Sequence, residues 1–139
     1  MIIAVDFDGT IVEHRYPAIG KELPFATQTL KRLIDDGHQL ILWSVREGEL
    51  LEEAVEWCAA RGVIFYAANK DYLEDSKETN RHYSRKLKVD LFIDDRNLGG
   101  LPDWGVIYEL ITTGQSYEEY LLGNGVERTS SRKKKWWQL

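Results

Sequence analysis

The first ten residues constrain the fold more than any other stretch of the chain. An apolar run, Ile2 to Val5, is too short for a helix and is followed at once by Asp6-Phe7-Asp8-Gly9-Thr10. Such a run is typical of a fully buried strand with acidic residues at its carboxyl end. Because open parallel sheets bind their ligands at that end of the strands, we expect a functional site immediately after Val5.

The residues after this strand suit a metal ion and a phosphate group together. Strand alternation would place Asp6 and Asp8 on one side and turn Phe7 toward the core. Two adjacent carboxylates stay ionised together only when a cation or bound donor groups compensate them. Gly9 permits a sharp turn that brings backbone N–H groups near an anion, and Thr10 adds a hydroxyl. The simpler interpretation, favoured if D-x-D stood alone, is an acidic strand end followed by a turn.

Length and composition indicate one ordinary globular domain. The chain has 139 residues, of which 43% are hydrophobic and 29% charged, which is enough for one sizeable core. No run approaches the length of a membrane span, and no targeting signal precedes the first strand, so we expect no membrane contact and a cytoplasmic location. The single cysteine, Cys58, lies on the apolar face of a predicted helix and should fill the core.

The charge is unevenly distributed along the chain. Residues 1–127 contain 13 basic and 23 acidic residues, a net charge of −10, whereas the last twelve residues are basic and contain Trp136 and Trp137. An acidic body argues against nucleic acid as the main partner and leaves a cation or a small substrate open. We expect the tail, 124–139, to be flexible; contact with a partner or an anionic surface is the alternative.

Short apolar runs alternate with amphipathic segments along the chain. Further strands are predicted at Leu40–Trp43, Val63–Ala67, Val89–Ile93 and Val106–Tyr108. Helices are predicted from Pro24 until Gly37 ends the first, at Glu47–Arg61, and from a cap at Ser116 through Leu122. This order predicts an α/β fold: a mostly parallel, roughly five-stranded sheet in a Rossmann-like three-layer sandwich over 1–123.

Two irregular segments interrupt this alternation. Ile11–Leu23 contains a proline and a glycine and has no sustained period, so we expect a flap or hairpin that overhangs the site. Ala68–Arg85 is polar and long for a plain connection, which indicates a partly helical functional loop.

Polar residues stand at the carboxyl ends of several predicted strands. They comprise Asp6 and Asp8 after the first strand, Ser44 after the second, Asp94 and Asp95 after the fourth, and Lys86 just before the fourth. Carboxylates, a hydroxyl and an ammonium group at one sheet edge would bind a divalent cation and a phosphoryl group.

At these positions the chain resembles the haloacid-dehalogenase (HAD) superfamily. D-F-D-G-T, L-I-L-W-S, a lysine eight residues before the acidic pair, and F-I-D-D resemble its four motifs in order, over roughly residues 1–110. The resemblance implies a Mg²⁺-dependent phosphatase that works through an aspartyl-phosphate. The flap and the 68–85 loop are each too short for a cap domain, which implies an open, capless site for a macromolecular substrate, or for a phosphorylated small molecule enclosed by a second subunit of a homo-oligomer.

The resemblance also implies a role for each motif residue. Asp6 would be the nucleophile, and Asp8 the general acid and then the general base, with its main-chain carbonyl on the metal. Ser44 and Lys86 would contact the transferring phosphoryl group. The metal set is Asp6, Asp8, Asp94 and Asp95, and the phosphate-binding set is Gly9, Thr10, Ser44, Arg46 and Lys86.

Several of these assignments have alternatives. Ser44 would also serve as the cap of the second helix, and Arg46 would also serve as an ion-pair partner of a nearby glutamate. Lys70 and Lys88 compete with Lys86 for the lysine role. For some neighbouring residues, a contact with the substrate or with the acidic pair and a merely solvent-exposed position are both open. They are His14 in the flap, Arg96 and Asn97 after the acidic pair, and the candidate stacking residues Tyr16, Tyr72 and Tyr83.

Two other functions compete with a phosphatase. A receiver-like signalling domain also combines acids, a hydroxyl and a lysine on a parallel sheet, but there the acidic pair follows the first strand and the phosphorylated aspartate the third. A regulatory module that binds phosphate and hydrolyses it poorly would use the same residues. Asp8 argues against dehalogenation, because the dehalogenase branch lacks that aspartate. The substrate itself is not determined by these motifs.

Overall fold

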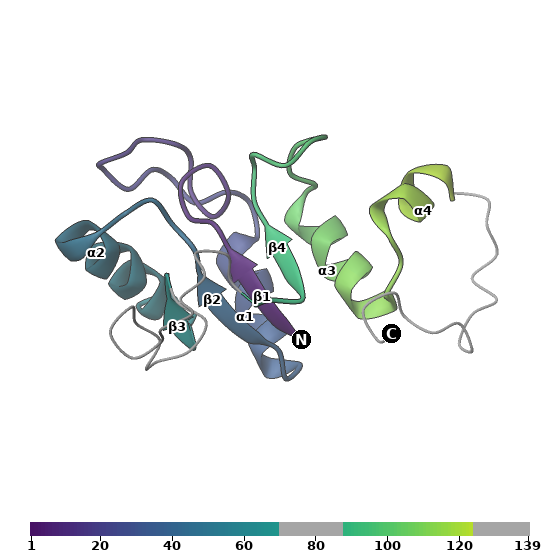
Figure 1. Ribbon diagram of the computed structural model, residues 1–139, viewed down its shortest axis with the longest axis horizontal. Helices are drawn as coiled ribbons and strands as arrows, with labels where there is room; N and C mark the ends of the chain where they lie inside the picture. The colour runs from purple at the N-terminus through teal and green to yellow at the C-terminus, as the bar shows by residue number, and fades with distance from the viewer. Residues whose placement is uncertain (70–87, 124–139) are drawn as a thin grey trace. The chain divides into compact units, whose positions relative to one another are not determined.

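A computed structural model describes residues 1–69 and 88–123 of the chain (Figure 1). It divides into two compact units, 1–101 and 102–139. The elements of the first unit are β1 Ile2–Val5, α1 Ala26–Asp35, β2 Gln39–Leu42, α2 Gly48–Ala59, β3 Ala67–Ala68 and β4 Leu91–Ile93. Those of the second are α3 Trp104–Thr113 and α4 Tyr117–Leu122. The predicted tail at 124–139 lies outside the described residues.

The four described strands form one parallel sheet in the order β3-β2-β1-β4. Their carboxyl ends therefore meet at one edge. The chain runs outward from β1 through β2 to β3 and returns to the other side of β1 at β4. The strand order thus reverses between β1 and β4, and a reversal of this kind is where ligands bind in open α/β sheets.

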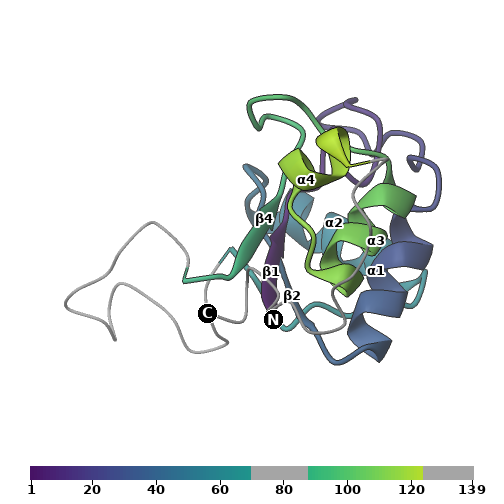
Figure 2. The ribbon, with the colours of Figure 1, turned by 90° about the vertical axis from the view of Figure 1, so that its right-hand side faces the viewer.

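Helices α1 and α2 lie on the same face of the sheet (Figure 2). Right-handed crossovers that step in the same direction, from β1 to β2 to β3, must place both helices on one side. Leu30 and Leu33 of α1, and Ala54 and Cys58 of α2, are buried. Cys58 has no solvent exposure, which confirms its predicted place in the core, and this burial raises the pKa of its thiol to about 12.

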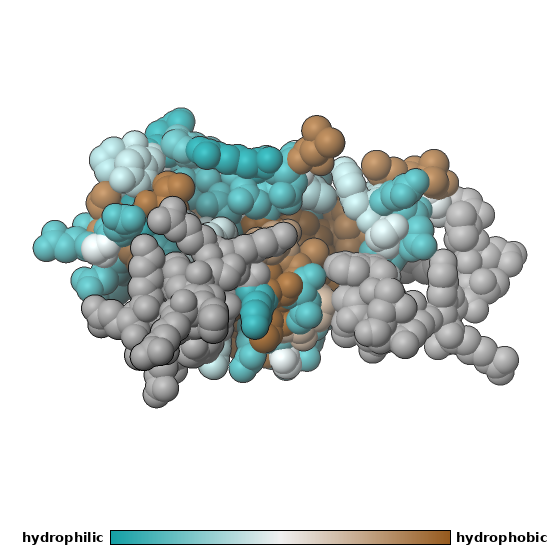
Figure 3. Space-filling view, viewed as in Figure 1, coloured by the Kyte–Doolittle hydropathy of each residue, from teal (hydrophilic) through white to brown (hydrophobic). Residues whose placement is uncertain are grey.

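The opposite face of the sheet is also apolar. Ala4, Ile41 and Ala67 form a buried cluster there, and Ile2 and Phe92 pack against it. Hydrophobic surface is visible over β1 and β4 on this side (Figure 3). An α/β fold with a parallel sheet is therefore confirmed, whereas the third layer of the predicted sandwich stays a prediction, as does the single domain over 1–123.

The predicted fifth strand, Val106–Tyr108, is wrong, because these residues lie within α3. Buried Trp104, Ile107 and Ile111 recur three and four residues apart, which is the period of a helix. The third strand also begins later than predicted. Val63 N–H donates to the Cys58 carbonyl at 3.0 Å, in the turn that follows α2. The first backbone hydrogen bond to β2 comes from the Tyr66 N–H to the Leu40 carbonyl at 2.8 Å, and the paired register begins at Ala67.

The predicted flap is confirmed as a hairpin. Val12 and Glu22 form an antiparallel bridge, and the Glu13 N–H donates to the Lys21 carbonyl at 2.7 Å. The predicted helix after Ser116 is confirmed as well. Among the residues described, none of the helices has both the length and the apolar character that crossing a membrane requires.

Candidate functional site

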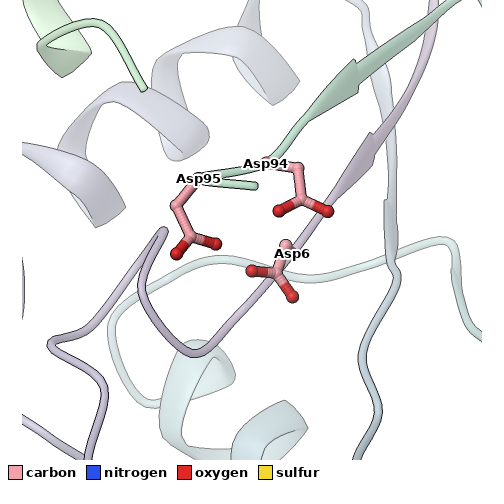
Figure 4. A group of neighbouring side chains, drawn as sticks. All are labelled: Asp6, Asp94 and Asp95. Carbon is pink, nitrogen blue, oxygen red and sulfur yellow. The ribbon is translucent and has the colours of Figure 1, made fainter. Parts of the chain in front are cut away.

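Three carboxylates converge where β1 and β4 end. Val5 pairs with Ile93, and the Asp6 N–H donates to the Ile93 carbonyl at 3.0 Å, so the register sets Asp6 beside Asp94. The carboxylates of Asp6, Asp94 and Asp95 face one another (Figure 4). One oxygen from each lies within 4.8 Å of the others, which is close enough for one metal ion to bind all three.

The turn after Asp8 is built to hold this cluster. Gly9 has φ +87°, and a Cβ atom at this position would collide with the Asp95 carboxylate. The hydroxyl of buried Thr10 lies 2.9 Å from Asp6 Oδ2 and 3.2 Å from Asp95 Oδ1, and it accepts the Asp95 N–H at 3.0 Å. The Thr10 hydroxyl has one hydrogen, which it donates to either Asp6 or Asp95 at a given moment. Thr10 therefore orients both acids but leaves their negative charges in place.

The cluster is electrostatically unfavourable without a cation. Burial raises the pKa of the Asp6 carboxyl to about 7, against hydrogen bonds from Thr10 and the Phe7 backbone that lower it, and the charge of Asp94 raises it further. Hard oxygen ligands that repel one another are the donor set that a divalent cation such as Mg²⁺ satisfies. These three residues therefore fit the predicted metal.

Asp8 stands apart from the other acids. Its carboxylate is buried and accepts from Arg46 at both oxygens, Nε to Oδ2 and Nη2 to Oδ1, each at 2.8 Å. The side chain of Asp8 is thus directed to Arg46 and lies outside the three-acid cluster. The predicted metal contact through its main-chain carbonyl stays a prediction.

Arg46 differs from its predicted role as a phosphate contact. Its side chain is 0% exposed, and its N–H groups are directed to Asp8 and to two flap carbonyls. A ligand from solvent reaches this guanidinium only if those contacts break. The alternative, an ion pair with a nearby glutamate, is wrong because the ion-pair partner is Asp8.

Ser44 faces the site but does not cap α2. The N-cap of α2 is Glu47, without a side-chain cap. Ser44 Oγ instead accepts the Arg46 N–H at 3.0 Å, and an oxygen that accepts in this way can still donate its own hydrogen. Asn69 Oδ1 accepts the Ser44 N–H at 2.7 Å, and Asn69 Nδ2 donates to the Arg46 carbonyl at 3.1 Å.

Asn69 was not predicted as a site residue. It follows β3 directly, so the rule that selected Ser44 after β2 would have selected it too. Its positive φ of 56° is tolerated by asparagine better than by most residues. Asn69 thereby fixes the loop that carries Ser44 and Arg46.

A cavity of about 170 Å³ opens at the carboxyl ends of the strands. Its lining residues are Asp6, Asp8, His14, Trp43, Ser44, Val45, Asp94 and Arg96. The two aspartates of the first motif thus share one cavity with Ser44, as predicted. Of the ambiguous residues, His14 and Arg96 lie at the cavity, and the Arg96 N–H donates to Asp94 Oδ1 at 2.9 Å.

The backbone N–H groups of Gly9 and Thr10, in the turn after Asp8, donate to carbonyls of the same segment. The Gly9 N–H donates to the Val12 carbonyl at 2.8 Å, and the Thr10 N–H to the Phe7 carbonyl at 3.2 Å. Their predicted contact with phosphate stays a prediction. Lys86 and its competitor Lys70 lie outside the described residues, together with Tyr72 and Tyr83, and Lys88 is exposed.

The fold and the site can be compared with known proteins. No protein-family model matches the chain, and no curated protein matches it. A solved structure of a conserved protein coded by a locus of Bacteroides thetaiotaomicron is 67% identical, with a TM-score of 0.81, over 86% of this chain and 96% of that chain. Our chain belongs to the family of that conserved protein.

Proposed function

We propose that the chain is a capless HAD-type phosphatase that hydrolyses phosphomonoesters through an aspartyl-phosphate on Asp6. The observation that carries the proposal is the register of β1 and β4, which sets Asp6 against Asp94 and Asp95 at the point where the strand order reverses. The Rossmann-like three-layer sandwich of that superfamily is part of the same proposal.

Asp6, Asp94 and Asp95 would hold Mg²⁺, and Asp8 would add its main-chain carbonyl. When bound, the ion supplies positive charge that offsets the repulsion between the Asp6 carboxylate and the phosphate. Thr10 keeps the acids oriented through its hydroxyl.

In the proposed mechanism, two aspartates carry out the nucleophilic attack and the proton transfers. An Asp6 oxygen attacks phosphorus while the bond from phosphorus to the leaving oxygen breaks. Asp8 gives the leaving oxygen a proton from its acid form, in which one carboxyl oxygen has parted from Arg46 while the other stays bound. Asp8 next takes a proton from water, which attacks the phosphorus of the aspartyl-phosphate and releases Asp6. Ser44 and Lys86 donate hydrogen bonds to the phosphoryl oxygens as charge develops there.

The test is a phosphatase screen over phosphorylated metabolites with Mg²⁺ and with EDTA. We expect turnover with Mg²⁺, none in EDTA, and recovery when excess Mg²⁺ is added. Asp6→Asn should reduce turnover to background and leave no phosphoprotein that alkali or hydroxylamine cleaves, whereas Asp35→Asn, an exposed carboxylate on α1, should match wild type.

Two results would contradict the proposal. Full activity in EDTA would exclude the metal, and a wild-type rate for Asp6→Asn at equal metal occupancy would exclude the phospho-aspartate. A receiver-like domain differs in a measurable way, because it would accumulate phosphoprotein from a phosphodonor without releasing phosphate over many turnovers.

A further inference from the structure

Arg46 is a charged side chain with no solvent exposure, in the loop between β2 and α2. Burying a guanidinium is costly unless its charge is paired and its donors are satisfied. The groups that pair with the Arg46 charge and accept its hydrogen bonds therefore indicate which parts of the structure this loop holds in place.

The first contact is the bidentate pair with Asp8, whose two distances are both 2.8 Å. The planar guanidinium donates to both carboxylate oxygens, so it fixes the rotation of the carboxylate as well as its position. The hydrogen bond with Asp8 also raises the pKa of Arg46.

The second set of contacts is with the flap. Nη1 donates to the Pro17 carbonyl at 3.1 Å, and Nη2 donates to the Ala18 carbonyl at 3.0 Å. The guanidinium carbon lies 5.2 Å from the ring centroid of Phe7 and 5.2 Å from that of Tyr16. The flap tip is exposed to solvent, yet two of its carbonyls and one ring are anchored on a buried cation.

We propose that Arg46 is a positioning residue that fastens the tip of the flap, residues 14–20, to the Asp8 carboxylate, so that the flap tip and the carboxylate adopt one arrangement together. Arg46 itself is held by Ser44 and Asn69. His14 belongs to the flap and lines the cavity, so the same anchor also sets the rim of the site. The part of this proposal that concerns catalysis rests on the proposed function; the anchoring of the flap does not.

The anchor can be tested without activity, by hydrogen exchange measured by mass spectrometry on the full chain. Arg46→Lys keeps the charge but cannot donate to both Asp8 oxygens in the same planar geometry. We expect the hydrogen-bonded amides at the base of the flap, Glu13 and Leu23, to exchange about tenfold faster while those of α1 are unchanged. The matched control is Arg61→Lys, since Arg61 also stacks on an aromatic ring, Trp57 at 3.6 Å, and donates to a backbone carbonyl, but lies away from the site.

A second variant covers the case in which Arg46→Lys does not fold. Tyr16→Leu removes the ring over the guanidinium from the exposed side and leaves the buried pair intact, and it should also speed exchange in the flap. Wild-type exchange of the flap in whichever of the two variants folds would overturn the anchor.

The catalytic part is tested by combining Arg46→Lys with Asp8→Asn. If Arg46 acts by positioning an acid, its substitution should slow an alkyl phosphate about tenfold more than an activated aryl phosphate, whose leaving group needs no proton. This loss should nearly vanish when Asp8 is already Asn. An equal loss on both substrates, in both backgrounds, would show a merely structural role. If the chain shows no phosphatase activity at all, the proposed function fails, and the exchange experiment still decides whether the flap is anchored.

Discussion

The Asp6 carboxyl is buried beside two other acids, so the cost of its charge depends on pH. Its pKa of about 7 lies well above the ordinary 3.8. The folded metal-free chain therefore keeps a proton that the unfolded chain releases. Between about pH 4 and 7, this group lowers the free energy of unfolding as pH rises, and the full cost is present above pH 7.

Asp6→Asn removes this charge and should stabilise the metal-free protein. At pH 8 in EDTA, we expect the free energy of unfolding to rise by about 1 to 2 kcal/mol, after allowing for the solvent that reaches the site. Denaturant unfolding at pH 8 and pH 4 measures the effect, which should nearly disappear at pH 4. Glu52→Gln, an exposed acid on α2, serves as the control. A gain of equal size at both pH values would show that Asp6 does not titrate near 7.

The lysine assignment makes a second prediction at the residue scale. Lys86→Ala should lower kcat/KM by about a hundredfold, because a cation beside the phosphoryl group stabilises charge that grows in the transition state. Lys70→Ala and Lys88→Ala should stay close to wild type in steady-state kinetics. Equal losses for all three would place the lysine role elsewhere.

At the scale of elements, the local sequence pattern predicts a helix or strand correctly where burial of apolar side chains alone decides its conformation. The runs Ile2–Val5 and Leu40–Leu42 are apolar on both faces because the strands are buried centrally, and they pair as β1 and β2. The prediction of a strand at Val106–Tyr108 is wrong because a three-residue apolar run does not distinguish a strand from a buried helix segment. The wider spacing of Trp104, Ile107 and Ile111 carries the helical signal.

The start of α4 shows a purely local signal that also makes a prediction. Ser116 Oγ accepts the Glu119 N–H at 3.1 Å, and the Glu119 carboxylate accepts the Ser116 N–H at 3.1 Å, which is a complete capping box. Ser116→Ala should weaken α4 by about 1 kcal/mol and speed hydrogen exchange of its amides about fivefold. Ser116→Thr keeps the hydroxyl and should restore protection. Unchanged exchange in Ser116→Ala would mean that other contacts hold this helix.

At the scale of the whole molecule, the candidate site divides into a part that sequence could predict and a part that it could not. Parallel strands place the residues after their carboxyl ends on one side of the sheet, so strand prediction puts Asp6, Asp94 and Asp95 on the same side. That β4 pairs directly with β1, and so brings the three carboxylates together, is set by the strand order. The pair of Asp8 with Arg46 does not follow from strand prediction. It joins residues 38 positions apart and depends on where the flap tip lies, which no periodicity encodes.

The same acids that destabilise the metal-free protein should stabilise it when Mg²⁺ is present, and this makes the last prediction. A ligand that binds only the folded state adds RT ln(1 + [L]/Kd), about 1.4 kcal/mol at ten times Kd. For wild type at pH 8, Tm should therefore rise steadily with Mg²⁺. Asp6→Asn starts from a higher Tm in EDTA but has lost one charged ligand, so its Tm should respond weakly.

The two Tm curves should consequently cross as Mg²⁺ is added, because one substitution removes both the repulsion and a ligand. Differential scanning calorimetry at fixed ionic strength, with Na⁺ replacing Mg²⁺, separates this from general screening of surface charge. Asp95→Asn should flatten the response as well, whereas Glu52→Gln should retain the wild-type slope. Parallel curves for wild type and Asp6→Asn would mean that the cation binds elsewhere, and that the three carboxylates of Figure 4 are not its site.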